Sequence, residues 1–153
     1  MIVSDYFAEL YVAGKFADAG WNVYFPHRDK GFDFIITKGI DNKFIIRPVQ
    51  VKGKYPTAGK TTKTTYGYVG KLTQMHNDMV LAIPFFSLAS LSAPSFVAYM
   101  PVCTIKPHKA KGYRCQPAQY KNGEASPRRD YIKFTDDNGL KLVESLNWGL
   151  EKE

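Results

Sequence analysis

The chain has 153 residues and a mass of 17.3 kDa, which is the size of one compact domain and excludes a two-lobed enzyme. Hydrophobic residues make up 44% and charged residues 23%, a composition that excludes a disordered or collagen-like chain. The 21 Lys and Arg residues exceed the 14 Asp and Glu residues, and the resulting net charge of +7 favours a polyanionic partner.

The two cysteines and the first residues bear on the compartment. Cys103 and Cys115 are too few for a disulfide scaffold and lack the four-ligand grouping of a structural zinc site, so we expect ordinary thiols. The first residues have no basic segment followed by an apolar stretch, and therefore no secretory signal is visible. The expected location is the cytoplasm.

The first predicted element is a helix over residues 4–19. Ser4 or Asp5 can cap this helix and Gly20 can end it. Apolar residues recur at helical spacing, and we expect them to form its buried stripe: Tyr6, Leu10, Ala13, Phe16 and Ala17. Glu9 lies next to the stripe, where a carboxylate is costly unless it is paired or binds something. It is either a boundary residue or a functional one.

Three strand-like runs follow, and the last two are expected to form a hairpin. They cover residues 21–25, 32–37 and 43–52, and Gly39, Asp41 and Asn42 form the turn between the last two. A turn centred near residues 40 and 41 places Asp33 opposite about Pro48, with Gln50 as its diagonal neighbour.

The hairpin is predicted to have one polar face and one apolar face. Because side chains alternate along a strand, Asp33, Gln50 and Lys52 share a face. The other face is suited to helix packing and carries Phe34, Ile36, Val49 and Val51. An acid, an amide and an amine that converge in this way suit metal-assisted hydrolysis of a phosphodiester. Asp33 and Gln50 offer oxygen ligands for Mg²⁺, and Lys52 can orient water or stabilise the transition state.

Positive charge is concentrated in two blocks. Residues 38–75 contain eight basic residues and one acid, and residues 106–133 contain eight basic residues and two acids. We expect the segment from Gly53 to Lys71 to be a loop whose lysines and tyrosines contact phosphates and bases, or a merely solvated loop. The candidate nucleic-acid contacts are Lys54, Lys60, Lys63, Tyr66 and Lys71.

The remaining elements are assigned from apolar runs and breakers. A short helix is expected over residues 72–77, then two buried strands over residues 79–86 and 96–102, whose prolines and serines argue against a membrane helix. The second basic block is predicted to be a loop because it contains Pro107, Pro117, Gly123 and Pro127. Residues 131–134 suit one more strand, and residues 138–150 a last helix.

The motif in the hairpin resembles that of a known nuclease superfamily. Gly31-Phe32-Asp33 is followed, after sixteen residues, by Gln50-Val51-Lys52, and a helix with Glu9 precedes both. This pattern resembles the PD-(D/E)xK superfamily, which includes type II restriction enzymes, archaeal Holliday junction resolvases and some intron-encoded homing endonucleases. The resemblance covers roughly residues 4–86. The pattern differs from the family in having Phe32 at the proline position and Gln50 at a carboxylate position. Some intron homing endonucleases are similar to this chain in having Gln at the latter position.

The resemblance implies a fold, a set of site residues and a cofactor. It implies an α/β domain with a restriction endonuclease-like core, a central mixed sheet flanked by helices in the order αβββαβ. Asp33, Gln50 and Glu9 would bind Mg²⁺, with Mn²⁺ able to substitute, and Lys52 would assist the attack of water. We expect one domain over residues 1–153, with its core at about residues 4–102 and the basic loop and C-terminal elements at residues 103–153.

The expected activity is that of a Mg²⁺-dependent endonuclease on DNA, duplex or branched. A homodimer would suit the cutting of both strands. Two alternative functions stay open. One is a nucleic-acid-binding module that has kept the fold without efficient hydrolysis, and Gln50 would then be the sign of that loss. The other is a domain whose partner is another protein.

Overall fold

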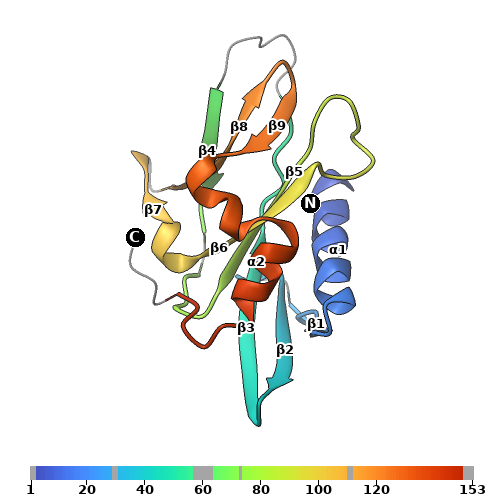
Figure 1. Ribbon diagram of the computed structural model, residues 1–153, viewed down its shortest axis with the longest axis vertical. Helices are drawn as coiled ribbons and strands as arrows, with labels where there is room; N and C mark the ends of the chain where they lie inside the picture. The colour runs from blue at the N-terminus through green and yellow to red at the C-terminus, as the bar shows by residue number, and fades with distance from the viewer. Residues whose placement is uncertain (1–2, 29–30, 57–63, 73, 110–111, 150–153) are drawn as a thin grey trace.

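The computed structural model describes residues 3–28, 31–56, 64–72, 74–109 and 112–149. It is a mixed α/β structure with two sheets, shown in Figure 1. The larger sheet, here sheet A, has the strand order β1-β2-β3-β5-β6. Its strands are β1 (Asn22–Tyr24), β2 (Phe34–Ile40), β3 (Lys43–Val51), β5 (Val80–Phe85) and β6 (Phe96–Pro101).

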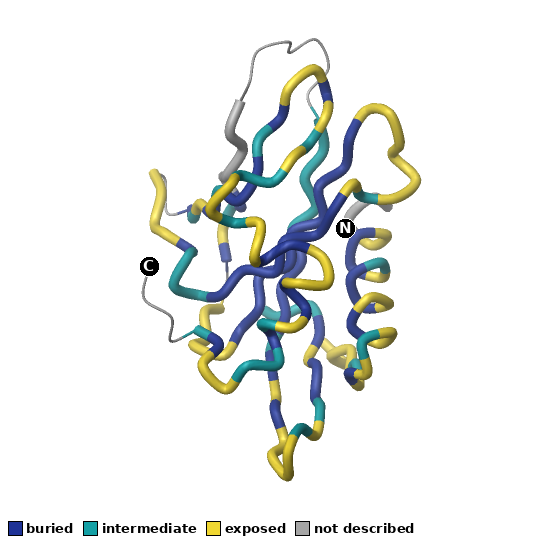
Figure 2. The backbone as a smooth tube through the Cα atoms, viewed as in Figure 1, coloured by how far each residue is buried: buried dark blue, intermediate teal, exposed yellow. Residues whose placement is uncertain are grey.

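Sheet A is mixed, as the sequence predicts. Its pairs are antiparallel except for β3 and β5, which run parallel with Val51 beside Ala82. The two apolar runs form β5 and β6, all of whose residues are buried, and Figure 2 shows the tube dark blue along both strands. Within the described residues, no helix is long and apolar enough to cross a membrane.

Parts of the two basic blocks form a second sheet, which the loop prediction missed. Sheet B has the order β4-β8-β7, and β9 also pairs with β8. Its strands are β4 (Thr64–Gly70), β7 (Lys106–Pro107), β8 (Tyr113–Lys121) and β9 (Glu124–Pro127). Pro117 suggested a loop, but proline also occurs in strands at bulges. Here the β8 residues that pair with β4 skip from Ala118 to Arg114, so Pro117 lies in a bulge of β8.

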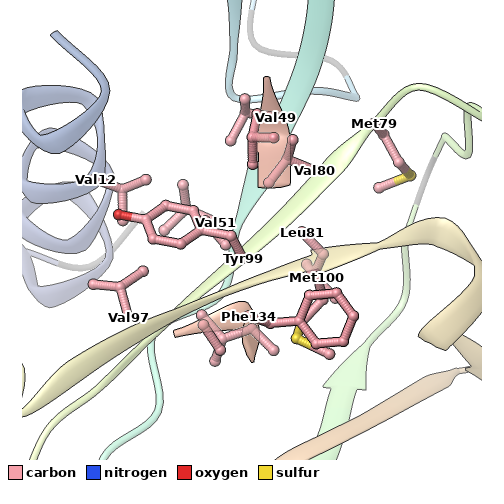
Figure 3. Close-up of a cluster of buried hydrophobic side chains, with 14 of the residues drawn as sticks. Val12, Val49, Val51, Met79, Val80, Leu81, Val97, Tyr99, Met100 and Phe134 are labelled. Carbon is pink, nitrogen blue, oxygen red and sulfur yellow. The ribbon is translucent and has the colours of Figure 1, made fainter. Parts of the chain in front are cut away.

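The first helix, α1 (Val3–Asp18), covers one face of sheet A. Figure 3 shows Tyr99 of β6 reaching towards Val12 of this helix, with Met100 and Phe134 on the opposite side of the sheet. Phe16 packs edge-on against Tyr99, with ring centroids 5.3 Å apart, and against Phe34 at 6.2 Å. The apolar face predicted for the hairpin is buried at all four positions: Phe34, Ile36, Val49 and Val51.

The predicted stripe of α1 is only partly correct. Ala13 and Phe16 are buried, whereas Tyr6, Leu10 and Ala17 are exposed. The helix instead turns Ala8, Glu9 and Val12 inward. The reason is steric: a Cβ atom on Gly53 would lie 3.3 Å from the Cβ of Ala8, so the helix approaches sheet A through small residues.

Three other sequence predictions are corrected by the structure. Residues 72 and 74–77 are not helical, so the crossover from β3 to β5 passes through β4 rather than through a helix in its described part. Residues 131–134 belong to the 3-10 helix η3 (Arg129–Phe134), and the last helix, α2 (Asp136–Val143), is shorter than expected. Beyond α2, the Trp148 indole donates to the carbonyl of Met79 at 2.8 Å, which ties the chain to sheet A instead of extending the helix.

Two helical glycines predict opposite stability effects of the same substitution. A Cβ atom on Gly14 of α1 meets nothing within 4 Å, whereas one on Gly139 of α2 would collide with the main-chain carbonyl of Phe134. We expect Gly14→Ala to stabilise the protein by about 1 kcal/mol, because Ala has the higher helix propensity. Gly139→Ala should destabilise it by about 2 kcal/mol through overpacking. Urea unfolding measures both, and equal effects of the two substitutions would contradict the packing of α2.

Candidate active site

The hairpin turn sets the register that brings the predicted residues together. Asp41 and Asn42 both have positive φ angles, 50° and 64°, as a two-residue hairpin turn requires. Ile40 therefore pairs with Lys43, and Phe34 pairs with Val49. The predicted register, with Asp33 opposite Pro48, is wrong because the turn lies one residue later. The pairing ends there, with Asp33 next to Phe34 on one strand and Gln50 next to Val49 on the other.

The carboxylate of Asp33 is hydrogen-bonded to the end of β3. Its Oδ2 accepts the main-chain N–H of Val51 at 2.7 Å, and its own N–H donates to the carbonyl of Val49 at 2.9 Å. Val51 is the residue between Gln50 and Lys52. The hydrogen bond therefore holds the carboxylate beside both of them.

Gln50 is the residue whose chemistry is most informative. Its side chain is 5% exposed, and its Nε2 donates to the carbonyl of Gly31 at 3.0 Å. Only the NH₂ end of an amide can donate to a carbonyl, so this bond fixes which way the amide points. The opposite atom, Oε1, is buried and has no hydrogen-bond partner among the described residues. An unsatisfied buried acceptor costs about 1–3 kcal/mol, so a bound ion or water molecule is the expected partner of this atom.

Glu9 reaches the same place from α1. It is 8% exposed, although the sequence suggested only a position at the edge of the buried stripe. The same rotation of α1 that packs Ala8 against Gly53 carries Glu9 inward. Glu9 lines one pocket together with Asp33 and Gln50.

Two lysines complete the pocket. The N–H groups of Lys52 and Lys54 donate to the carbonyls of Ala82 and Pro84, at 3.0 and 2.9 Å, so the chain continues beside β5 after β3 ends. Burial lowers the pKa of Lys54, and the Lys52 ammonium lowers it further. Sequence reasoning placed Lys54 on an outer loop, but the alternation of positions 50, 52 and 54 could have found it.

The pocket has a volume of about 260 Å³. Water occupies about 30 Å³ in the liquid, so this space admits a hydrated ion or a phosphate group. Seven residues line it: Glu9, Asp33, Gln50, Val51, Lys52, Gly53 and Lys54. Among the described residues no cluster of three or more His, Cys, Asp or Glu could hold a metal. The donor set is instead two carboxylates and an amide oxygen, the hard ligands that Mg²⁺ and Mn²⁺ prefer.

The other candidate nucleic-acid contacts lie on or just after β4, or outside the described residues. Lys60 and Lys63 lie outside the described residues. Tyr66 is on β4, where its main chain pairs with Ala118. Lys71 is exposed just after β4.

One residue that the sequence did not suggest fixes the position of Lys54. The Tyr120 hydroxyl on β8 lies 3.0 Å from the carbonyl oxygen of Lys54 and 2.8 Å from that of Phe86. Tyr120 is 4% exposed. Sheet B is therefore docked on the segment that lines the pocket. A single tyrosine in a basic block gives no signal of this role.

The chain matches no protein-family model, and it matches no curated protein. The functional argument therefore depends on the geometry of the pocket.

Proposed function

We propose that the protein is a metal-dependent endonuclease of the PD-(D/E)xK type that hydrolyses phosphodiester bonds of DNA. The observation that carries this proposal is the buried Oε1 of Gln50, which has no hydrogen-bond partner among the described residues and belongs to a residue that lines a pocket with two carboxylates. An oxygen held in this way is an acceptor without a donor, and a cation satisfies it.

Asp33, Gln50 and Glu9 would hold the ion. When bound, Mg²⁺ supplies activation of water and neutralises the charge that grows on the phosphate. The protein does the positioning: the Gly31 carbonyl orients the Gln50 amide, and the Val51 N–H orients the Asp33 carboxylate.

The lysines would supply positive charge at the scissile phosphate. Lys52 lines the pocket next to the Asp33 carboxylate and can orient the attacking water or stabilise the pentavalent transition state. Lys54 lines the same pocket and provides a second ammonium group for the phosphate.

The order of the elements supports the same family. A helix that carries Glu9 precedes an antiparallel β1-β2-β3 meander, and β5 runs parallel to β3. This arrangement is similar to the αβββαβ core that the sequence motif implies. It differs in the crossover, where β4 stands and the described residues form no helix.

A plasmid-cleavage assay tests the proposal. We expect the purified protein to nick or linearise supercoiled DNA with Mg²⁺ or Mn²⁺, and a chelator should abolish this activity. Lys52→Ala should slow cleavage by about 10²- to 10³-fold, the usual effect of removing one transition-state donor. Lys43→Ala, at the exposed hairpin turn, removes the same charge and should leave the rate unchanged.

The neutral amide at position 50 favours one alternative, a nucleic-acid-binding module without efficient hydrolysis, because a carboxylate ligand is lost there. DNA that is retarded in a gel but stays uncut with either metal ion would establish this alternative and contradict the nuclease.

A further inference from the structure

Strand β8 has an outward face that the catalytic proposal does not use. Cys115, Ala118 and Tyr120 are buried in the core. The intervening positions face outward, and all four carry basic or amide side chains: Arg114, Gln116, Gln119 and Lys121. This face of β8 therefore presents side chains that can donate hydrogen bonds.

At one end of this face, two cations stand directly opposite each other. Lys106 of β7 pairs with Arg114 of β8, and both residues are exposed. Directly opposed side chains of an antiparallel pair share a face, and like charges in such a pair are destabilising. An anion bound across the two strands would offset this repulsion.

A third cation is held beside the pair. The Arg128 guanidinium donates to the carbonyl of Gln116 at 2.9 Å and lies over the ring of Tyr131, with 5.6 Å to its centroid. The sequence contains no Asp or Glu between Asp41 and Asp78 or between Asp78 and Glu124, so β4, β7 and β8 carry no acid. These three strands therefore contribute basic and no acidic side chains to sheet B.

Strand β8 links this surface to the segment that lines the pocket. The Tyr120 hydroxyl contacts the main chain at Lys54, and Arg114 lies six residues before Tyr120 on the same strand. The bulge in β8 shortens this stretch, because residues 114 to 120 pair with only the four steps from Tyr68 to Thr64 of β4, which is about 13 Å at about 3.3 Å per residue. Base pairs rise by about 3.4 Å, so this length corresponds to about four base pairs. Figure 1 shows β7 at one end of β8 and the β8–β9 turn at the other.

We infer that Lys106, Arg114 and Arg128 form a phosphate-binding surface for duplex DNA that flanks the cleavage point. The identity of the polyanion rests on the proposed function. The surface contributes affinity and orientation and takes no part in the chemistry, since phosphate contacts position a protein on a duplex without selecting its sequence.

The test measures DNA binding by the cleavage-impaired Asp33→Asn protein as a function of salt. In that background, the double variant Lys106→Gln/Arg114→Gln should bind a duplex of about 30 base pairs more weakly and lower the slope of log K against log salt by about 2, close to one per phosphate contact. The matched control is Lys15→Gln/Lys43→Gln, which removes two other exposed lysines. It should leave the slope unchanged. An unchanged slope in the double variant, or an equal loss in the control pair, would overturn the inference.

These experiments distinguish a failure of the nuclease proposal from a failure of the phosphate-surface proposal. If the wild type never cuts DNA but the double variant loses salt-dependent binding, the phosphate surface stands and the nuclease falls. If the wild type cuts DNA and the double variant binds like its parent, only the surface is rejected. The phosphate surface for DNA would also be rejected if the protein bound RNA duplexes through Lys106 and Arg114 and did not bind DNA.

Discussion

Asp33→Asn is expected to reduce Mg²⁺-dependent DNA cleavage by about 10³-fold while the protein stays folded. Metal-assisted stabilisation of charge contributes several kcal/mol to such a reaction, and each 1.36 kcal/mol is about tenfold in rate. The asparagine Oδ1 can still accept the N–H of Val51, which Asp33 accepts at 2.7 Å. The substitution therefore removes the charge and keeps the hydrogen bond that holds the side chain.

The matched control is Asp41→Asn at the hairpin turn. Asp41 has a φ of 50°, a conformation that Asn also adopts readily, and its side chain is exposed. Single-turnover cleavage rates, with circular dichroism to check folding, compare the two variants. Equal rates for Asp33→Asn and the wild type would remove Asp33 from the catalytic site.

Gln50→Leu is expected to abolish metal binding without unfolding the protein. Leucine keeps most of the volume and removes the buried Oε1 along with the amide that donates to Gly31. The Gly31 carbonyl, which is only half-buried, loses its donor, so we expect the free energy of unfolding without metal to fall by about 1 kcal/mol, the low end of the cost of an unsatisfied group. Loss of a direct ligand should weaken metal affinity by more than about 100-fold, since outer-shell partners alone contribute about 10- to 100-fold.

Thermal unfolding with and without Mn²⁺ measures this effect. A ligand at 100 times its dissociation constant stabilises the folded state by about 2.7 kcal/mol, and Gln50→Leu should lose this increment. Gln50→Glu supplies the contrast. It restores an anionic oxygen but cannot donate to the Gly31 carbonyl, so it should be less stable than the wild type without Mn²⁺ and gain more from it. A Mn²⁺ shift in Gln50→Leu equal to that of the wild type would exclude Oε1 as a ligand.

The sequence predicted much of sheet A because its signals are local. Asp41 and Asn42 favour a hairpin turn, and the alternation of apolar residues on either side sets which face of β2 and β3 is buried. The register was wrong because the residue range of the turn depends on which two positions take positive φ, and Gly39, Asp41 and Asn42 all can.

The second sheet could not be predicted from the same signals. The pairing of β4 with β8 joins segments far apart in the sequence, and the bulge at Pro117 disguises a strand as a loop. Positive charge in the sequence also did not distinguish surface residues from buried ones. Arg47 belongs to the first basic block, yet it is 5% exposed and donates to the carbonyls of Val143 and Ser145 at 3.2 and 2.8 Å. Burial lowers its pKa, and the role of this side chain is to hold the end of α2.

The candidate site was predictable in its residues and not in its details. Spacing identified Asp33, Gln50 and Lys52, but the inward turn of Glu9 depends on the close approach of Ala8 to Gly53, which is a tertiary contact. The orientation of the Gln50 amide depends on the Gly31 carbonyl, which no sequence pattern indicates.

A crystal of the protein soaked in Mn²⁺, with data collected at the manganese absorption edge, tests the metal site most directly. We expect one anomalous peak within coordination distance of Gln50 Oε1 and the Asp33 carboxylate, with Nε2 still bonded to the Gly31 carbonyl. A pocket without such a peak, in which Gln50 Oε1 accepts a hydrogen bond from a protein donor, would contradict the metal-dependent nuclease.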